Sequence, residues 1–232
     1  MLKSDIMKLG DSLMKKRIET RQDLVIEEMK RSYWYFQKEV NLKLESRGYG
    51  LVKDKSRREE KVASISATGF GLASLVIGVE HGWIEDITAY QRANRTLETF
   101  LNNVPGKNGF FYHFVDIETA QRVWNCEVSI IDTAIFLCGA ILCAEYFKGE
   151  IQEKVELLYK AVQWNWYLED SKQYFAMSYT PENGLTGAWD MYAEQLMVYI
   201  LGISSPTFPV SEQLYDNFLK PKQERHYFFL SW

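Results

Sequence analysis

Apolar residues recur along this chain mostly at helical spacing, and they indicate two kinds of helix. Residues 62–79 and 128–144 are apolar or small around the whole circumference, which is typical of helices that protein surrounds on every side. Each is followed by a segment with a single apolar stripe, at residues 86–101 and 150–163. We therefore predict buried inner helices that alternate with outer helices exposing one face.

Helical patterns also occupy both ends of the chain. Residues 5–40 show helical periodicity, and the apolar run at residues 191–203 is followed by a polar helix predicted at residues 211–220. Only residues 110–115 and their neighbours have a pattern that is compatible with a strand. The predicted fold class is therefore all-α. A ring of inner helices would be enclosed by outer helices, with a pocket formed by the loops at one end.

The chain is too short to close such a ring. Its 232 residues fit one domain. We count about eight helices, whereas a closed ring of six hairpins needs about twelve helices and on the order of 300 residues. We expect residues 1–20 to form a helical lead-in. Residues 21–232 would then form a toroid domain that is truncated at its C-terminal end.

Composition and charge argue against several classes of protein. A net charge of −4 is unfavourable for a nucleic-acid partner, because phosphate contacts need clustered Lys and Arg. No uninterrupted apolar stretch reaches the roughly 18 residues of a membrane span, and residues 1–30 carry no export signal. A cytoplasmic location is expected. Cys126, Cys138 and Cys143 are predicted to be buried free thiols, and we expect neither a metal site nor a cofactor.

Several segments stand in a characteristic order and spacing. They are residues 35–36, 50–56, 63–73, 78–84, 109–116, 127–134, 164–166, 188–195 and 205–209. Together they resemble the glycoamylase-like family, which includes endo-β-1,2-glucanases and a domain of cyclic β-1,2-glucan synthases. The resemblance implies an (α/α)6 toroid of the glycosidase type with a glucan as its substrate.

Two carboxyl groups are needed to cleave a glycosidic bond, one protonated to assist the leaving oxygen and one ionised to activate water or attack carbon. Asp132 interrupts the apolar helix at residues 128–144, where an unpaired carboxylate costs several kcal/mol. Glu127 opens the same helix. Structural explanations are open for both, since Asp132 could bond to a helix end and Glu127 could favour the helix dipole. The family resemblance implies that both acids lie beside the glucan pocket.

Asp190 and Glu194 are four residues apart and are predicted to project from one helix face. Asp190 is explained equally well as an acid at a helix N-terminus, and it is kept as a candidate to bind substrate. Glu194 corresponds to an acid that the family keeps in its pocket. We therefore take Glu194 as the first candidate for a catalytic carboxyl, with Asp132 or Glu127 as its partner.

Aromatic residues make up 15% of the chain, which suits a pocket that stacks on sugar rings. Further candidates to contact the substrate lie in the predicted loops and among the tryptophans. They are Asp54, Tyr112, His113, Asp116, Trp124, Trp164, Trp166 and Trp189. Core packing is an alternative for His113 and for each tryptophan.

These patterns predict a glycoside hydrolase-like domain that acts on a β-linked glucan, with β-1,2-glucan suggested by the resemblance. Two alternatives stay open: a transglycosylase domain of a larger synthase, and a non-catalytic glycan-binding or scaffold domain. The expected partners are an oligo- or polysaccharide and further domains of a longer polypeptide. Glu194, Asp132 and Glu127 are expected to converge on one cavity, and the family implies inversion.

Overall fold

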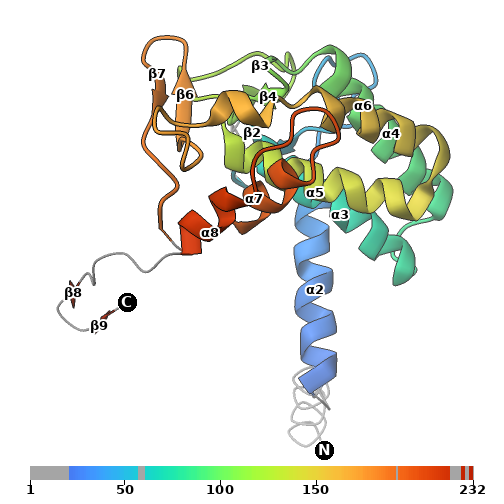
Figure 1. Ribbon diagram of the computed structural model, residues 1–232. Helices are drawn as coiled ribbons and strands as arrows, with labels where there is room; N and C mark the ends of the chain where they lie inside the picture. The colour runs from blue at the N-terminus through green and yellow to red at the C-terminus, as the bar shows by residue number, and fades with distance from the viewer. Residues whose placement is uncertain (1–20, 57–60, 192, 220–225, 228–229, 232) are drawn as a thin grey trace, which may run out of the picture.

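The computed structural model describes residues 21–56, 61–191, 193–219, 226–227 and 230–231. Its first helix, α2 (Arg21–Lys38), projects from the body of the molecule (Figure 1). Tyr33 is the buried residue of α2, and its ring lies 5.3 Å from that of Trp83. Contacts near the C-terminal end therefore anchor the helix. The predicted lead-in at residues 1–20 lies outside the described residues.

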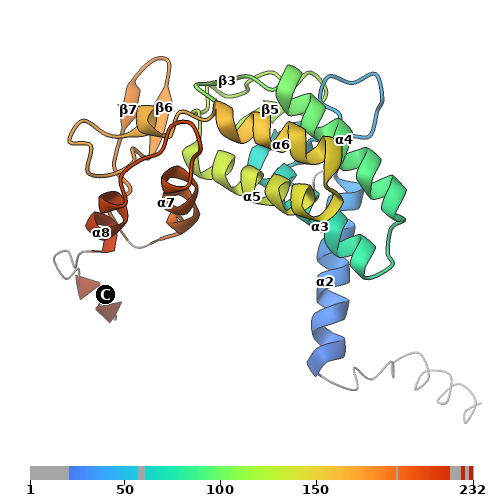
Figure 2. The ribbon, with the colours of Figure 1, turned by 45° about the vertical axis from the view of Figure 1, so that its right-hand side comes forward.

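The two helices that are apolar all round lie side by side, and they form the centre of the fold. They are α3 (Ile65–Glu80) and α5 (Ile130–Phe147) (Figures 1 and 2). Their backbones approach so closely that a Cβ on Gly139 would lie 2.0 Å from the carbonyl oxygen of Gly69. The prediction of a neighbouring inner pair is confirmed, and both helices are largely buried, although Phe70 of α3 and Leu142 of α5 are exposed.

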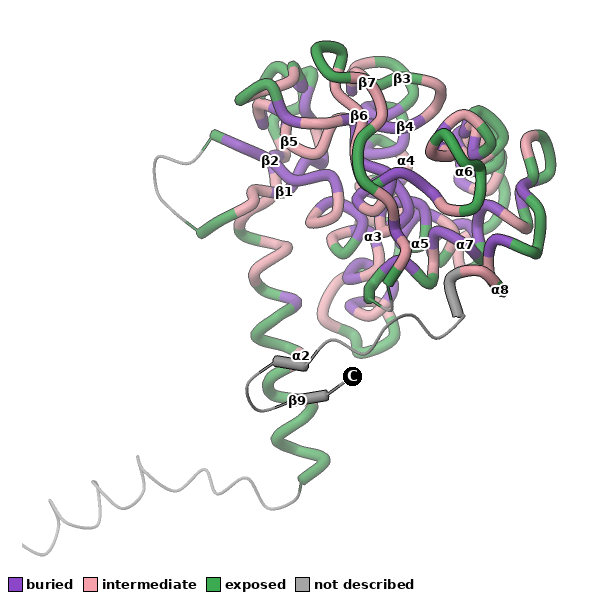
Figure 3. The backbone as a smooth tube through the Cα atoms, turned by 60° about the vertical axis from the view of Figure 1, so that its left-hand side comes forward, coloured by how far each residue is buried: buried purple, intermediate pink, exposed green. Residues whose placement is uncertain are grey.

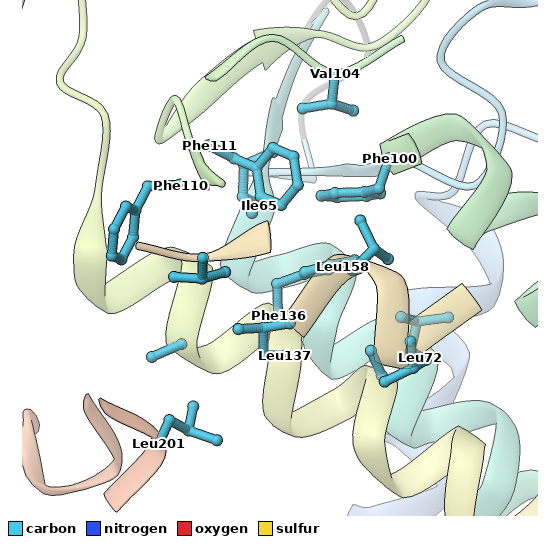
Figure 4. Packing of buried hydrophobic residues seen from close by; sticks show 14 of the residues in the cluster. Ile65, Leu72, Phe100, Val104, Phe110, Phe111, Phe136, Leu137, Leu158 and Leu201 are labelled. Carbon is cyan, nitrogen blue, oxygen red and sulfur yellow. The ribbon is translucent and has the colours of Figure 1, made fainter. Parts of the chain in front are cut away.

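Two amphipathic helices cover this pair, as their apolar stripes predicted. They are α4 (Asp86–Asn102) and α6 (Gly149–Ala161), and both turn their apolar stripes inward. Phe100 of α4 stacks on Phe136 of α5 with ring centroids 3.7 Å apart, and Leu158 of α6 lies in the same cluster (Figure 4). Buried residues concentrate where these helices meet, whereas much of α2 is exposed (Figure 3).

Short strands form where an all-α fold had been predicted, so the class is mainly rather than wholly helical. Residues 62–64, predicted to begin the first inner helix, form strand β2 (Val62–Ser64), which lies between β1 (Val52–Lys53) and β5 (Phe114–Asp116) in an antiparallel sheet. The described residues also form three antiparallel hairpins. They are β3 (Gly106–Lys107) with β4 (Phe110–Phe111), β6 (Ser178–Thr180) with β7 (Gly184–Thr186), and β8 (His226–Tyr227) with β9 (Leu230–Ser231).

The C-terminal part contains shorter helices than the sequence pattern predicts. A 3-10 turn, η1 (Trp164–Tyr167), follows α6. The next helix, α7 (Leu196–Ile203), begins five residues after residue 191, where the apolar run of the sequence starts. The helix α8 (Gln213–Leu219) comes after it. The described residues thus form seven α-helices, of which α3, α4, α5 and α6 follow the predicted alternation of inner and outer helices. The (α/α)6 toroid, predicted to be incomplete in this chain, stays a prediction.

The environment of α5 also decides how its apolar sequence is interpreted. Among the described residues, α5 is long and apolar enough to cross a membrane, but it packs against α3, α6 and α7 as a core helix does.

The three cysteines differ in exposure. Cys143 is buried within α5, and burial raises the pKa of its thiol to about 12. Cys126 is buried as predicted. Cys138 is exposed, so the prediction of three buried thiols was wrong for that residue.

Candidate active site

The N-terminus of α5 holds the buried carboxylate that interrupts its apolar sequence. Ser129 caps the helix in an extended conformation, and its Oγ accepts the backbone N–H of Asp132 at 3.1 Å. The same hydroxyl donates to Oδ2 of Asp132 at 2.6 Å. Asp132 is therefore bonded at the helix end rather than unpaired, which offsets the cost of burying it.

His113 lies between β4 and β5, and its ring contacts the carboxylate of Glu127 as well as that of Asp132. Its Nδ1 is 2.8 Å from Oε1 of Glu127, and its Nε2 is 3.5 Å from Oδ1 of Asp132. The backbone N–H of His113 donates to the carbonyl of Glu127 at 2.9 Å, and Ile65 at the start of α3 donates to the carbonyl of His113 at 3.1 Å. The chain thus places one imidazole between two carboxyl groups that are five residues apart.

Charge at this cluster follows from those contacts. Burial lowers the pKa of His113, but the hydrogen bond to Glu127 and the charges of Asp132, Glu127 and Asp54 outweigh it, so the pKa is raised overall. The hydrogen bond from His113 lowers the pKa of Glu127 against the opposing effect of burial. Near neutral pH, Glu127 is therefore held in its ionised form.

The three side chains also come close enough together to be considered as cation ligands. One ligand atom from each of His113, Glu127 and Asp132 lies within 4.8 Å of the others. The two carboxylates, however, face opposite nitrogens of one ring, and a single ion can bind only one of those nitrogens. The geometry is that of an ion-paired histidine, and we assign no metal here.

The backbone before α5 is bonded to segments on both sides of it in the chain. Val128 pairs with both Tyr112 and Tyr179, and the hydroxyl of Tyr167 donates to its carbonyl oxygen. Burial raises the pKa of Tyr167 far above its ordinary value, so it stays a neutral donor. These bonds hold the residues that precede α5, including Glu127, in a fixed position.

Glu194, the first candidate from the sequence, lies in the segment that precedes α7. It is exposed in the turn before α7, rather than within a helix as predicted. It is not part of the group formed by His113, Glu127 and Asp132. Asp190 is half-buried in the loop before it.

Two cavities of the described region lie against α4. The larger, with a volume of about 400 Å³, lies between the loop at residues 44–49 and α4, and the smaller lies between α2, α3 and α4. Neither is lined by Glu127, Asp132 or Glu194. The expected convergence of these three acids on one cavity therefore stays a prediction.

Other predicted contact residues differ in how accessible they are. Asp54 is half-buried and acts on His113 through its charge. Asp116 accepts the backbone N–H and the hydroxyl of Thr119, which lower its pKa despite burial and engage it in a turn. Tyr112 is half-buried, with the guanidinium of Arg122 4.5 Å from its ring centroid.

The tryptophans divide into core and accessible side chains. Trp164 is fully buried against Phe110, and Trp189 is 8% exposed, so packing accounts for both. Trp166 is half-buried beside Tyr179. Trp124 is 64% exposed, has a φ of 58°, and meets Phe114 edge-on. Trp124 and Trp166 therefore remain as faces that a ligand could reach.

Sequence reasoning missed three residues that support the cluster: Ser129, Phe114 and Tyr167. Ser129 could have been found, because a serine three residues before an acid at the start of an apolar run is the signature of a helix cap. Phe114 stacks on the ring of His113 at 3.6 Å. The hydroxyl of Tyr167 reaches Val128, which is 39 residues away along the chain, and no local pattern specifies such a contact.

Comparisons with known proteins agree with this fold. A family model described as "Putative glucoamylase" matches residues 187–229. An exo-β-1,2-glucooligosaccharide sophorohydrolase of Parabacteroides distasonis is 24% identical over 184 residues, covering 72% of this chain and 25% of the relative.

Solved structures extend the likeness over most of the chain. One from Bacteroides uniformis, with the same description as the family model, superposes with a TM-score of 0.76 and 23% identity, covering 91% of this chain and 54% of its own. A β-1,2-glucanase from Parabacteroides distasonis gives a TM-score of 0.72 and 21% identity, and the match covers 85% of this chain and 30% of the glucanase. The chain thus spans about half or less of the length of these proteins, and the likeness shows a shared fold.

Proposed function

We propose, from its confirmed resemblance to the glycoamylase-like family, that this chain is a glycoside hydrolase-like domain that acts on a β-linked glucan. The observation that carries the proposal is the pairing of Glu127 and Asp132 with one imidazole at the N-terminus of α5. The names of the curated relative and of one structural neighbour make β-1,2-glucan the first substrate to test.

The chemistry divides between the acids according to their surroundings. A lowered pKa keeps Glu127 ionised, which suits a group that activates water or stabilises positive charge better than one that donates a proton. Glu194, which is exposed, is the proposed partner on the other side of the scissile bond. Asp132 is the alternative partner, and Trp124 and Trp166 are proposed as faces for the sugar rings.

The test offers β-1,2-, β-1,3- and β-1,4-glucans to the protein, as this chain and as the complete product of its gene, and measures new reducing ends over time. Release of reducing ends from β-1,2-glucan alone supports the proposal. Products that change in length without a net gain of reducing ends would favour the transglycosylase alternative. If no glucan is altered or bound, the proposal fails.

A non-catalytic role has one specific observation in its favour. The ring of Trp124 is 64% exposed, so a sugar could stack on it without being cleaved. Calorimetric binding of a glucan that the protein never cleaves would support this second function.

A further inference from the structure

Both nitrogens of the His113 ring are engaged by carboxylates. Nδ1 faces Glu127 at 2.8 Å, and Nε2 faces Asp132 at 3.5 Å. A neutral imidazole has one N–H donor and one lone pair, whereas an ionised carboxylate can only accept hydrogen bonds. With both acids ionised, only the protonated ring satisfies both sides, since a lone pair would otherwise face a negative oxygen.

The ring is also fixed in orientation. It stacks on Phe114 with an interplanar angle of 18°, and the His113 backbone is bonded to the carbonyl of Glu127. Asp132 is held from its own side by Ser129. His113 therefore connects a carboxylate in the loop before α5 to a carboxylate within the first turn of α5.

Charges around the ring favour its protonated form. Asp54, Glu127 and Asp132 act on His113 from three segments of the chain, and burial opposes them. Arg122 and Cys126 lie near Glu127, and the neutral hydroxyl of Tyr167 lies near both Glu127 and Asp132. Three carboxylates thus surround one imidazole, and the positive charge of Arg122 acts on the carboxylate of Glu127.

We infer that His113 is a positioning residue that ties Glu127 to Asp132 at the N-terminus of α5, instead of binding sugar through a free ring nitrogen. The catalytic meaning of this inference rests on the proposed function, but the pairing itself does not. Loss of the ring proton breaks one of the two contacts, so the neutral ring no longer ties the two carboxylates together. The spacing of the acids is thereby linked to pH.

The pairing can be tested without any substrate by following histidine ring signals by NMR as the pH changes. The chain has three histidines, so His113→Gln identifies one signal and His81→Gln, at an exposed position outside the site, identifies another. We expect the midpoint of His113 to lie above the ordinary value of about 6.5, and to fall in both Glu127→Gln and Asp132→Asn. A midpoint at or below that value that neither variant changes would overturn the inference.

Kinetics separate positioning from sugar binding once a cleaved glucan is known. We expect His113→Gln to lower kcat roughly 10- to 100-fold with little change in KM, because misplaced catalytic groups slow the chemical step. His81→Gln should leave both constants unchanged. A raised KM at constant kcat would mean that His113 binds sugar and would overturn the positioning role. If the wild type cleaves no glucan, the proposed function fails, and the NMR titration still decides the pairing.

Discussion

Ser129 and Asp132 bond to each other in both directions at the start of α5, through the backbone N–H of Asp132 and the hydroxyl of Ser129. This reciprocal pair caps the most buried helix of the fold and at the same time fixes one carboxylate of the candidate site. Stability and site geometry therefore depend on the same two side chains.

Replacing Ser129 by Ala should destabilise the protein by about 1 kcal/mol, the usual effect of removing a helix cap. The loss should exceed that value if Asp132 then stays buried without its partner. Ser129→Thr keeps the hydroxyl and serves as the matched control. Urea unfolding followed by circular dichroism measures both, and equal stability of the Ala and Thr variants would contradict the capping role.

The close approach of α3 and α5 predicts a larger effect at Gly139. Its substitution by Ala places a Cβ 2.0 Å from the carbonyl oxygen of Gly69, so the helices must separate. We expect a loss of roughly 1–3 kcal/mol or more, as for other overpacked cores. Gly82→Ala is the control, since its positive φ strains the backbone but no atom lies within 4 Å of the new Cβ. A thermal melt in which Gly139→Ala is the more stable variant would refute the packing argument.

The pair formed by His113 and Glu127 predicts how stability depends on pH. The raised pKa of His113 gives stabilisation that is complete below its ordinary value of 6.5 and lost as pH rises through its folded value. The lowered pKa of Glu127 gives stabilisation that is complete above 4.5 and lost as pH falls through its folded value. The pair should therefore contribute most between pH 4.5 and 6.5. Chemical unfolding across this range, compared with His113→Gln, measures the contribution, and identical pH profiles would exclude it.

Glu194→Gln removes an ionisable group and nearly preserves shape. If Glu194 is the catalytic acid or base, the rate of glucan hydrolysis should fall on the order of 100-fold or more. Folding should be unaffected, because Glu194 is exposed. Glu212→Gln, another exposed glutamate in the same part of the chain, is the matched control. Wild-type rates in the Glu194 variant would transfer the catalytic assignment to Glu127 and Asp132.

Trp124 is exposed and Trp164 is buried, so each serves as the control for the other. Trp164→Ala should destabilise the protein by about 3–5 kcal/mol, because the ring is fully buried. Trp124→Ala should change stability little and weaken glucan binding, because its ring is exposed beside the Phe114 that covers His113. Unfolding curves and glucan titrations of both variants check this. Unchanged glucan affinity in Trp124→Ala would remove it from the proposed site.

Local patterns predicted the helices well because their signals are local. The all-apolar circumference of α3 and α5, and the single stripes of α4 and α6, specify which helices are buried and which are half-exposed. The same patterns failed at Val62–Ser64, because a short run of apolar and small residues fits a helix or a strand equally well. There, pairing with Phe114–Asp116 decides the outcome.

The sequence by itself determined that a costly acid, Asp132, interrupts an apolar helix and that Glu127 precedes it. Only the tertiary structure decided that His113 lies between these two acids, because the sheet that joins β2 to β5 brings residue 113 to the start of α3 and of α5. Burial likewise separated Trp164 from Trp124, which were equal candidates as sugar platforms from the sequence. Contacts between residues far apart in the chain depend on how the elements pack, and periodicity within one element carries no information about them.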